Sequence, residues 1–180
     1  LPGKNILNLN GKPLIAWTIE QVKQSALIDR LVISTDSKEI ALISEKYGAS
    51  VPELRPNYLA TDEASSMDVL EYTIQKVESE KQIYDYIMLL EPTSPLRKKG
   101  DLDNIIKLAV DNQEKDGVIS VGSIQLEHPM IAKKISADGT IMPYVEDTPV
   151  VYQRQQHNEA LCPYGVGYVI KTSVFKMTHT

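Results

Sequence analysis

The sequence of 180 residues has very little cysteine and no long hydrophobic run. Its single cysteine, Cys162, excludes an internal disulfide and a cysteine-based metal cluster, and this fits a reducing compartment. The longest apolar runs, such as residues 86–90, are far shorter than the ~20 residues of a membrane-spanning helix. The first 25 residues lack the basic start and apolar core of a signal peptide. The sequence therefore predicts a cytoplasmic protein that does not enter a membrane.

Positive charge and histidine are also scarce. There are 19 Lys and Arg residues against 24 Asp and Glu, so the formal net charge is −5. This acidic balance argues against a general nucleic-acid binder, which would carry a basic patch or stripe. His128, His157 and His179 have no partner three or four residues away, so local spacing builds no metal site. Each is expected to be a surface or structural histidine.

What the sequence does contain is an alternation of short β-rich runs and amphipathic helical segments, in one domain of residues 1–180. Strands are expected at residues 31–34, 49–51, 86–90, 118–121 and 165–170. Helices are expected to begin at Pro13, at Asp36 or Ser37, at Ser65 or Ser66, and at Asp101. This order predicts an α/β fold with a mostly parallel central sheet and helices on both faces. Residues 131–135 and 140–144, joined near Asp138-Gly139, predict an added β-hairpin.

Two polar loops are candidate ligand sites. In open α/β sheets, ligands bind at the carboxyl ends of strands, and the loop of residues 91–97 follows a predicted strand. Two prolines stiffen this loop, which presents Glu91, Thr93, Ser94 and Arg97. The opening Pro2-Gly3-Lys4-Asn5 can bring backbone N–H groups, a cation and an amide to a phosphate or a base. The alternatives are a solvated rigid loop for the first and an ordinary turn for the second.

The same two loops carry a resemblance to a known family. Leu1-Pro2-Gly3-Lys4-Asn5, taken with Leu90-Glu91-Pro92-Thr93-Ser94-Pro95-Leu96-Arg97, resembles the acylneuraminate cytidylyltransferases, the CMP-sialic acid synthetases. Further matches are Leu54-Arg55-Pro56, Thr61-Asp62 with Ser65-Ser66, and Gln153-Arg154-Gln155, so the resemblance runs along nearly all of the chain. It implies a Rossmann-like nucleotidyltransferase that couples CTP to an acidic nine-carbon sugar and releases pyrophosphate. It also implies a homodimer, with residues 125–155 as the dimerisation arm.

The resemblance implies a role for each matched residue. Lys4 and Asn5 would contact the nucleotide, with Lys4 near phosphate and Asn5 near the base or ribose. Arg55 and Ser66 would help to hold the cytidine. The residues implied to bind the sugar acid are Glu91, Thr93, Ser94, Arg154, Tyr164 and Gly165. Lys4 and Arg154 are the implied catalytic residues.

Two residues depart from the family's pattern. Glu91 replaces a usual Gln, which puts a negative charge where a neutral amide would meet an anionic sugar, and Tyr164 replaces a usual Asn. The family's leader segment is expected before Leu1 and its acidic Mg²⁺ ligands beyond residue 180, so no metal ligand is assigned in this chain. Two alternatives remain open. One is a nucleotidyltransferase for another sugar acid, such as an eight-carbon ulosonic acid, and the other is a nucleotide-binding relative without catalysis.

Overall fold

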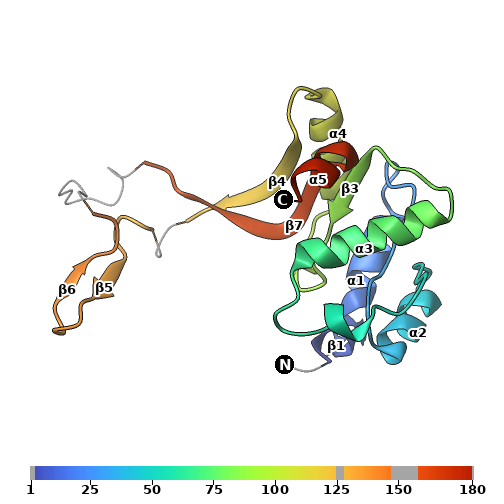
Figure 1. The fold of residues 1–180 in the computed structure, drawn as a ribbon, viewed down its shortest axis with the longest axis horizontal. Helices are drawn as coiled ribbons and strands as arrows, with labels where there is room; N and C mark the ends of the chain where they lie inside the picture. Colours follow the sequence, from blue (N-terminus) through green and yellow to red (C-terminus); the bar gives the residue numbers. More distant parts are fainter. Residues whose placement is uncertain (1–2, 125–127, 147–157, 180) are drawn as a thin grey trace. The chain divides into compact units, whose positions relative to one another are not determined.

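Helices and short strands alternate along the chain in the computed structural model, which describes residues 3–124, 128–146 and 158–179 (Figure 1). The chain forms two compact units, one of Leu1–Ser120 with Gly165–Thr180 and one of Val121–Tyr164. The elements of the first unit are η1 (Lys4–Ile6), β1 (Asn8–Leu9), β2 (Lys12–Pro13), α1 (Leu14–Lys23), α2 (Lys38–Lys46), η2 (Asn57–Leu59), α3 (Ser66–Ser79), β3 (Tyr86–Leu89), α4 (Asp101–Asp111) and α5 (Thr172–Thr178). Strands β4 (Gly117–Ser123) and β7 (Leu161–Lys171) run through both units, and β5 (Lys133–Ile135) and β6 (Ile141–Pro143) belong to the second.

The central sheet has three strands in the order β3-β7-β4. Strand β7 runs antiparallel to β3, with Tyr86 opposite Lys171. It also runs antiparallel to β4, because Lys171 N donates to Asp116 O at one end and Ile124 N to Ala160 O at the other. Strands β3 and β4 therefore point the same way, as two strands linked by a helix should, but β7 separates them. The described strands of this sheet pair antiparallel, so they do not confirm the predicted mostly parallel sheet; periodicity identifies strands without identifying their neighbours.

A parallel contact joins two of the other predicted strand segments. Val32 forms a bridge with Ser50, supported by a 2.8 Å hydrogen bond from Ile33 N to Ser50 O. This pair lies beside a core made by α1 and α2, whose buried members include Ile15 and Ile19. The predicted strands at residues 31–34 and 49–51 are thus reduced to one bridge, but their segments do lie side by side.

The predicted starts of three helices are confirmed. Ser37 caps α2, with its Oγ accepting from Ile40 N at 3.3 Å, and Ser65 caps α3 by accepting from Met67 N at 3.1 Å. Gly100, in the left-handed region at φ +91°, turns the chain into α4 at Asp101. Pro13, in contrast, belongs to β2 and precedes α1. These local signals work because each satisfies or relieves backbone groups at a helix end.

The last helix closes the first unit against the start of β3. Thr172 N donates to Asp85 O at 2.8 Å, and its hydroxyl donates to Tyr84 O at 2.6 Å. Phe175 of α5 is almost completely buried. The sequence analysis did not predict α5, which is only seven residues long. Helix α5 therefore packs in the first unit, which also contains the loop after β3.

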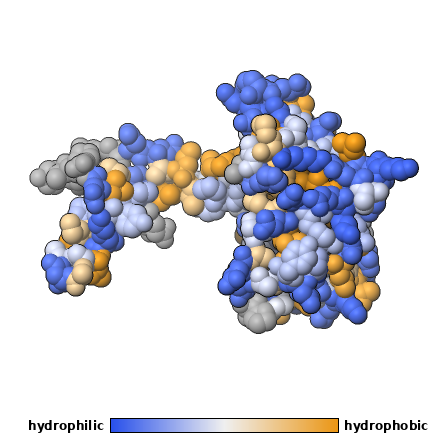
Figure 2. Space-filling model, in the orientation of Figure 1, coloured by the Kyte–Doolittle hydropathy of each residue, from blue (hydrophilic) through white to orange (hydrophobic). Residues whose placement is uncertain are grey.

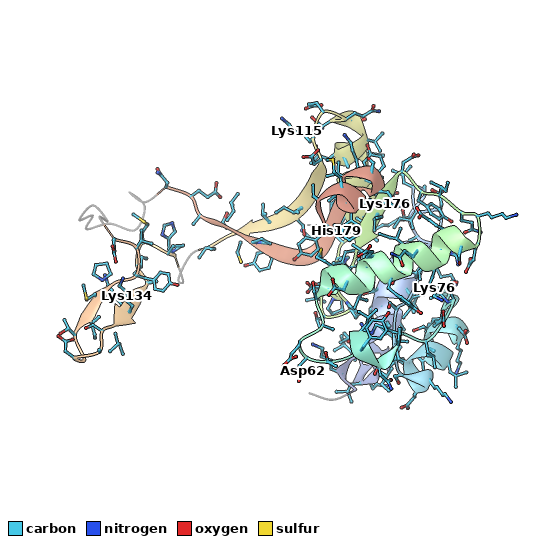
Figure 3. All side chains as sticks on the ribbon, viewed as in Figure 1. Asp62, Lys76, Lys115, Lys134, Lys176 and His179 are labelled. Atoms are coloured by element: carbon cyan, nitrogen blue, oxygen red, sulfur yellow. The ribbon has the colours of Figure 1, made fainter. Side chains whose placement is uncertain are left out.

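The second unit contains the predicted hairpin. Strands β5 and β6 pair antiparallel, with Lys133 opposite Pro143, and Gly139 turns between them at φ +85°. Lys134 on β5 forms an ion pair with Glu146 at 2.9 Å (Figure 3 labels Lys134). The hairpin prediction is confirmed. Of the predicted arm at 125–155, residues 125–127 and 147–155 lie outside the described part of the chain.

Candidate functional site

The first polar loop folds into a tight turn. Gly3, at φ +66°, accepts a 3.0 Å hydrogen bond from Ile6 N and begins η1. A residue with a side chain is strained in this left-handed region, so the glycine belongs to the turn. Lys4 is exposed, whereas its neighbour Asn5 is half-buried. The loop therefore separates a solvated cation from an inward-facing amide.

Asn5 lines a large cavity in the first unit, about 1340 Å³ in volume. The other residues that the sequence analysis placed at a nucleotide, Arg55 and Ser66, line the same cavity, and so does Asp62, which Figure 3 labels. Segments far apart in the sequence, namely η1, the loop before η2 and the start of α3, thus come together around one space. Lys4 is not among the lining residues.

Two polar atoms in this cavity have no partner among the described residues. They are Asn5 Oδ1, an acceptor, and Arg55 Nε, a donor, and both are buried. The backbone N–H of Arg55 donates to Thr35 O at 2.8 Å, and its Nη2 lies 3.4 Å from Asp36 Oδ1. Buried polar groups are nearly always hydrogen-bonded in native proteins, so such atoms suit a polar ligand. Asp36 pairs with Arg55, while the cap of α2 is Ser37.

The second polar loop meets β7. A Cβ placed on Gly165 would overlap Glu91 Oε2 and would lie 3.0 Å from Ser94 Oγ. The Glu91 carboxylate therefore rests directly on the bare backbone of Gly165, beside a hydroxyl. The structure thus brings together three of the predicted sugar-binding residues, across more than 70 positions of sequence. Thr93, from the same loop, is exposed.

Arg97 occupies a different place from the one that its loop suggested. Only 7% of its surface is exposed. Arg97 is therefore not a solvated cation, and its side chain does not face outward to bind an anion. Its guanidinium donates to backbone carbonyls of the loop and of β7 and to side chains of α1. Burial lowers the pKa of Arg97, and the carboxylates of Glu91 and Asp101 act in the opposite direction. The side chain remains charged at physiological pH.

Two other predicted site residues remain. Tyr164 belongs to the second unit, where its ring lies over Gly122 of β4, since a Cβ on that glycine would overlap the ring. Arg154 lies outside the described residues. Cys162 is exposed, like the other residues at the start of β7 (161–164).

Over residues 3–124, 128–146 and 158–179, no three His, Cys, Asp or Glu side chains gather as a metal site would require. His128 is instead structural, with Nε2 2.9 Å from Asn158 O. None of the helices in this described part is both long enough and apolar enough to span a membrane.

Comparison with known sequences decides the family. The profile of the family described as Cytidylyltransferase matches residues 1–175. The chain belongs to the cytidylyltransferase family. The fold agrees with this family. The structure of CMP:2-keto-3-deoxy-manno-octonic acid synthetase complexed with CTP matches this chain with a TM-score of 0.70 and 18% sequence identity. The matched region covers 98% of this chain and 70% of the synthetase chain. This likeness supports the nucleotidyltransferase type of α/β fold that the sequence predicted.

Curated relatives carry related names. CMP-N,N'-diacetyllegionaminic acid synthase of Legionella pneumophila is 40% identical over 144 residues, which is 79% of this chain and 60% of the relative. Pseudaminic acid cytidylyltransferase of Campylobacter jejuni is 39% identical over 64% of this chain and 50% of the relative. The chain therefore spans about half to three fifths of the length of these two relatives.

Sequence reasoning missed the residues that hold Arg97. Thr18 and Gln21 of α1 both contact its guanidinium, more than 70 positions away in sequence. In the sequence, Thr18 and Gln21 are ordinary polar positions of an amphipathic helix. No local pattern could have linked them to the Pro-Thr-Ser-Pro loop.

Proposed function

We propose that the protein transfers CMP from CTP to a nonulosonic, sialic-acid-like sugar acid and releases pyrophosphate. Membership of the cytidylyltransferase family along residues 1–175 supports the reaction class. The observation that carries the proposal is a pair of buried atoms in one cavity, Asn5 Oδ1 and Arg55 Nε, which have no hydrogen-bond partner in the described part of the chain. An acceptor and a donor in a half-apolar space suit a nucleoside, whose polar edges need both.

The nature of the acceptor sugar is supported by the relatives and by the second loop. The names of the relatives refer to legionaminic and pseudaminic acids, which are nonulosonic acids. Glu91 and Ser94 gather at Gly165, where they offer a carboxylate and a hydroxyl to a polyhydroxylated ligand. We propose that these groups, with Thr93 and Tyr164, bind the hydroxyl and amide groups of the sugar, and that Arg154 binds its carboxylate.

The proposed step is an in-line displacement at phosphorus. An oxygen of the sugar's anomeric hydroxyl forms a bond to the α-phosphorus of CTP, and the bond from that phosphorus to the bridging oxygen breaks. Pyrophosphate takes the electron pair, and the hydroxyl proton passes to solvent or to a base. Such a reaction needs positioning and charge neutralisation more than covalent help. We propose that Lys4 and Arg154 neutralise the phosphates and the reacting centre.

We propose Mg²⁺ as the cofactor, because a bound Mg²⁺ neutralises charge on phosphate oxygens. The described residues do not by themselves fit such a site, since no acidic cluster forms among them and Asp36 is paired with Arg55. Its ligands are therefore proposed to lie outside the described residues.

We also propose a cytoplasmic homodimer that uses the hairpin unit as its dimerisation arm. Ile135 and Ile141 on β5 and β6 are 76% and 68% exposed, and apolar side chains interrupt the polar surface of this hairpin (Figure 2). Exposed apolar clusters on a small unit are typical of protein interfaces. A free, exposed thiol at Cys162 fits a reducing compartment.

The test is turnover by the full-length protein with CTP, Mg²⁺ and a panel of nine-carbon and eight-carbon ulosonic acids, read as pyrophosphate release. Release with a nine-carbon acid is expected, and EDTA should abolish it. Preference for the eight-carbon acid would favour the alternative transferase. Binding of CTP by calorimetry without turnover on any acid would favour a non-catalytic relative and contradict the proposal.

A further inference from the structure

Arg97 is a buried charged side chain to which the proposed reaction gives no role. All three of its guanidinium nitrogens donate hydrogen bonds to other parts of the first unit. Nε donates to Val166 O at 2.5 Å, and Nη1 donates to Thr18 Oγ1 at 3.0 Å and Gln21 Oε1 at 3.3 Å. Nη2 donates to Glu91 O and to Gly165 O, each at 2.8 Å. The side chain thus joins α1, the loop after β3, and β7.

The two carbonyls that accept from Nη2 belong to Glu91 and Gly165, and these two residues also make a second contact with each other. The Glu91 carboxylate rests on the backbone of Gly165, where a Cβ would overlap it. One nitrogen of Arg97 therefore bridges the backbone carbonyls of the same two residues, Glu91 and Gly165, between which the Glu91 carboxylate makes its contact.

Helix α1 holds the same loop from its far end. Gln21 Nε2 donates to Pro95 O at 2.7 Å and to Arg97 O at 3.3 Å, while its Oε1 accepts from the guanidinium. The loop is consequently anchored to a helix whose inner face is part of the core. Side chains that touch substrate are held accurately only when such supporting contacts lock them.

We propose that Arg97 is a positioning residue, which sets the Glu91–Gly165 wall of the sugar site without touching either substrate. This inference rests on the proposed function for the identity of the ligand at that wall. Among the described residues, the acceptors of its hydrogen bonds are backbone carbonyl and side-chain oxygens of α1, the loop and β7. Lysine keeps the charge but lacks the planar fork of donors, so it cannot bridge the same carbonyls.

The test uses Arg97→Lys in the full-length protein, with Lys99→Ala as the matched control. Lys99 lies in the same segment and is exposed, so its substitution removes a positive charge without touching the network. For Arg97→Lys, kcat/KM for the sugar acid should fall about 100-fold, the scale of a misplaced reacting group, while the Kd for CTP changes less than about threefold. Lys99→Ala should change neither. Equal losses for sugar and CTP, or sugar turnover kept within threefold, would overturn the proposal.

A second measurement does not depend on turnover. Hydrogen exchange at the amides of Ser94, Leu96 and Gly165 should speed up at least tenfold in Arg97→Lys and remain unchanged in Lys99→Ala. If Arg97→Lys does not fold, Gln21→Ala should produce the same pattern to a smaller extent, because it removes the loop contacts and spares the charge. A wild-type protein without turnover would refute the proposed function alone, whereas unchanged exchange in the folded variants would refute the role of Arg97.

Discussion

At the residue scale, the cavity of the first unit is lined by two side chains with polar atoms available to hydrogen-bond a ligand. Asn5 Oδ1 and Arg55 Nε are both buried and lack partners among the described residues. Leaving such atoms unpaired costs about 1–3 kcal/mol each, so the unbound protein is poised to gain from a polar ligand. The backbone N–H of Arg55 donates to Thr35 O, and its Nη2 lies 3.4 Å from Asp36 Oδ1, so the Asp36 carboxylate already pairs with the guanidinium.

Substitution of Asn5 by alanine should weaken CTP binding. Removing the acceptor deletes one hydrogen bond of about 1 kcal/mol, which is a roughly fivefold to tenfold rise in the Kd measured by calorimetry. Asn10→Gly is the matched control, since Asn10 is exposed and sits at φ +50°, where glycine is unstrained. The control should bind CTP like the wild type. An unchanged Kd in Asn5→Ala would remove the main support for a nucleotide in this cavity.

Glu91→Gln tests the charge at the sugar wall. The carboxylate is exposed and rests on Gly165, so it repels the carboxylate of a sugar acid bound there. For an exposed pair about 4 Å apart with the dielectric constant of bulk water, this repulsion is about 1 kcal/mol, so the KM for the sugar acid should fall about fivefold in the variant. The difference should shrink at high salt. A rise in KM would instead indicate that Glu91 accepts hydrogen bonds from the sugar, with the charge itself contributing little.

At the element scale, the site depends on how closely β7 approaches the loop after β3. Gly165→Ala should lower kcat/KM for the sugar acid by about tenfold or more, because the new methyl group overlaps the Glu91 carboxylate and displaces it. Adding Glu91→Ala removes that overlap. The loss in the double variant should therefore be smaller than the product of the two single losses. Strictly multiplicative losses would mean that the two residues act separately.

The order of elements was predictable, but their neighbours were not. Ser37, Ser65 and Asp101 mark helix starts through local backbone chemistry, and those predictions are confirmed. The insertion of β7 between β3 and β4 depends on pairing between residues far apart in the sequence, such as Tyr86 with Lys171, which leaves no periodic trace in either strand. Residues 31–34 are predicted as a full strand from their apolar run. Leu31 and Ile33 do pack against the buried core of α1, yet the segment contributes a single bridge.

At the scale of the whole molecule, the second unit is the proposed contact with a second copy. The double variant Ile135→Lys with Ile141→Lys should convert a dimer to a monomer, because charges on both strands of the hairpin oppose burial of its apolar surface. Ile83→Lys is the control, since Ile83 is 82% exposed and lies in the first unit. Light scattering coupled to size-exclusion chromatography gives the mass. A dimer that survives in the double variant would contradict this use of the hairpin.

The sequence alone determined the cytidylyltransferase resemblance, the α/β order and the hairpin, because each can be identified from short contiguous segments without knowing how they pack. Glu91 was also identified from sequence as the unusual residue of its loop. Tertiary structure alone decided that Arg97 turns inward, that Asn5, Arg55 and Ser66 share one cavity, and that Glu91 rests on Gly165. The reason is physical: the guanidinium of Arg97 can hold three segments together only after folding has brought their oxygen atoms within hydrogen-bonding reach. In a chain with little positive charge, one of the few arginines, Arg97, is therefore buried and holds the loop beside the proposed site.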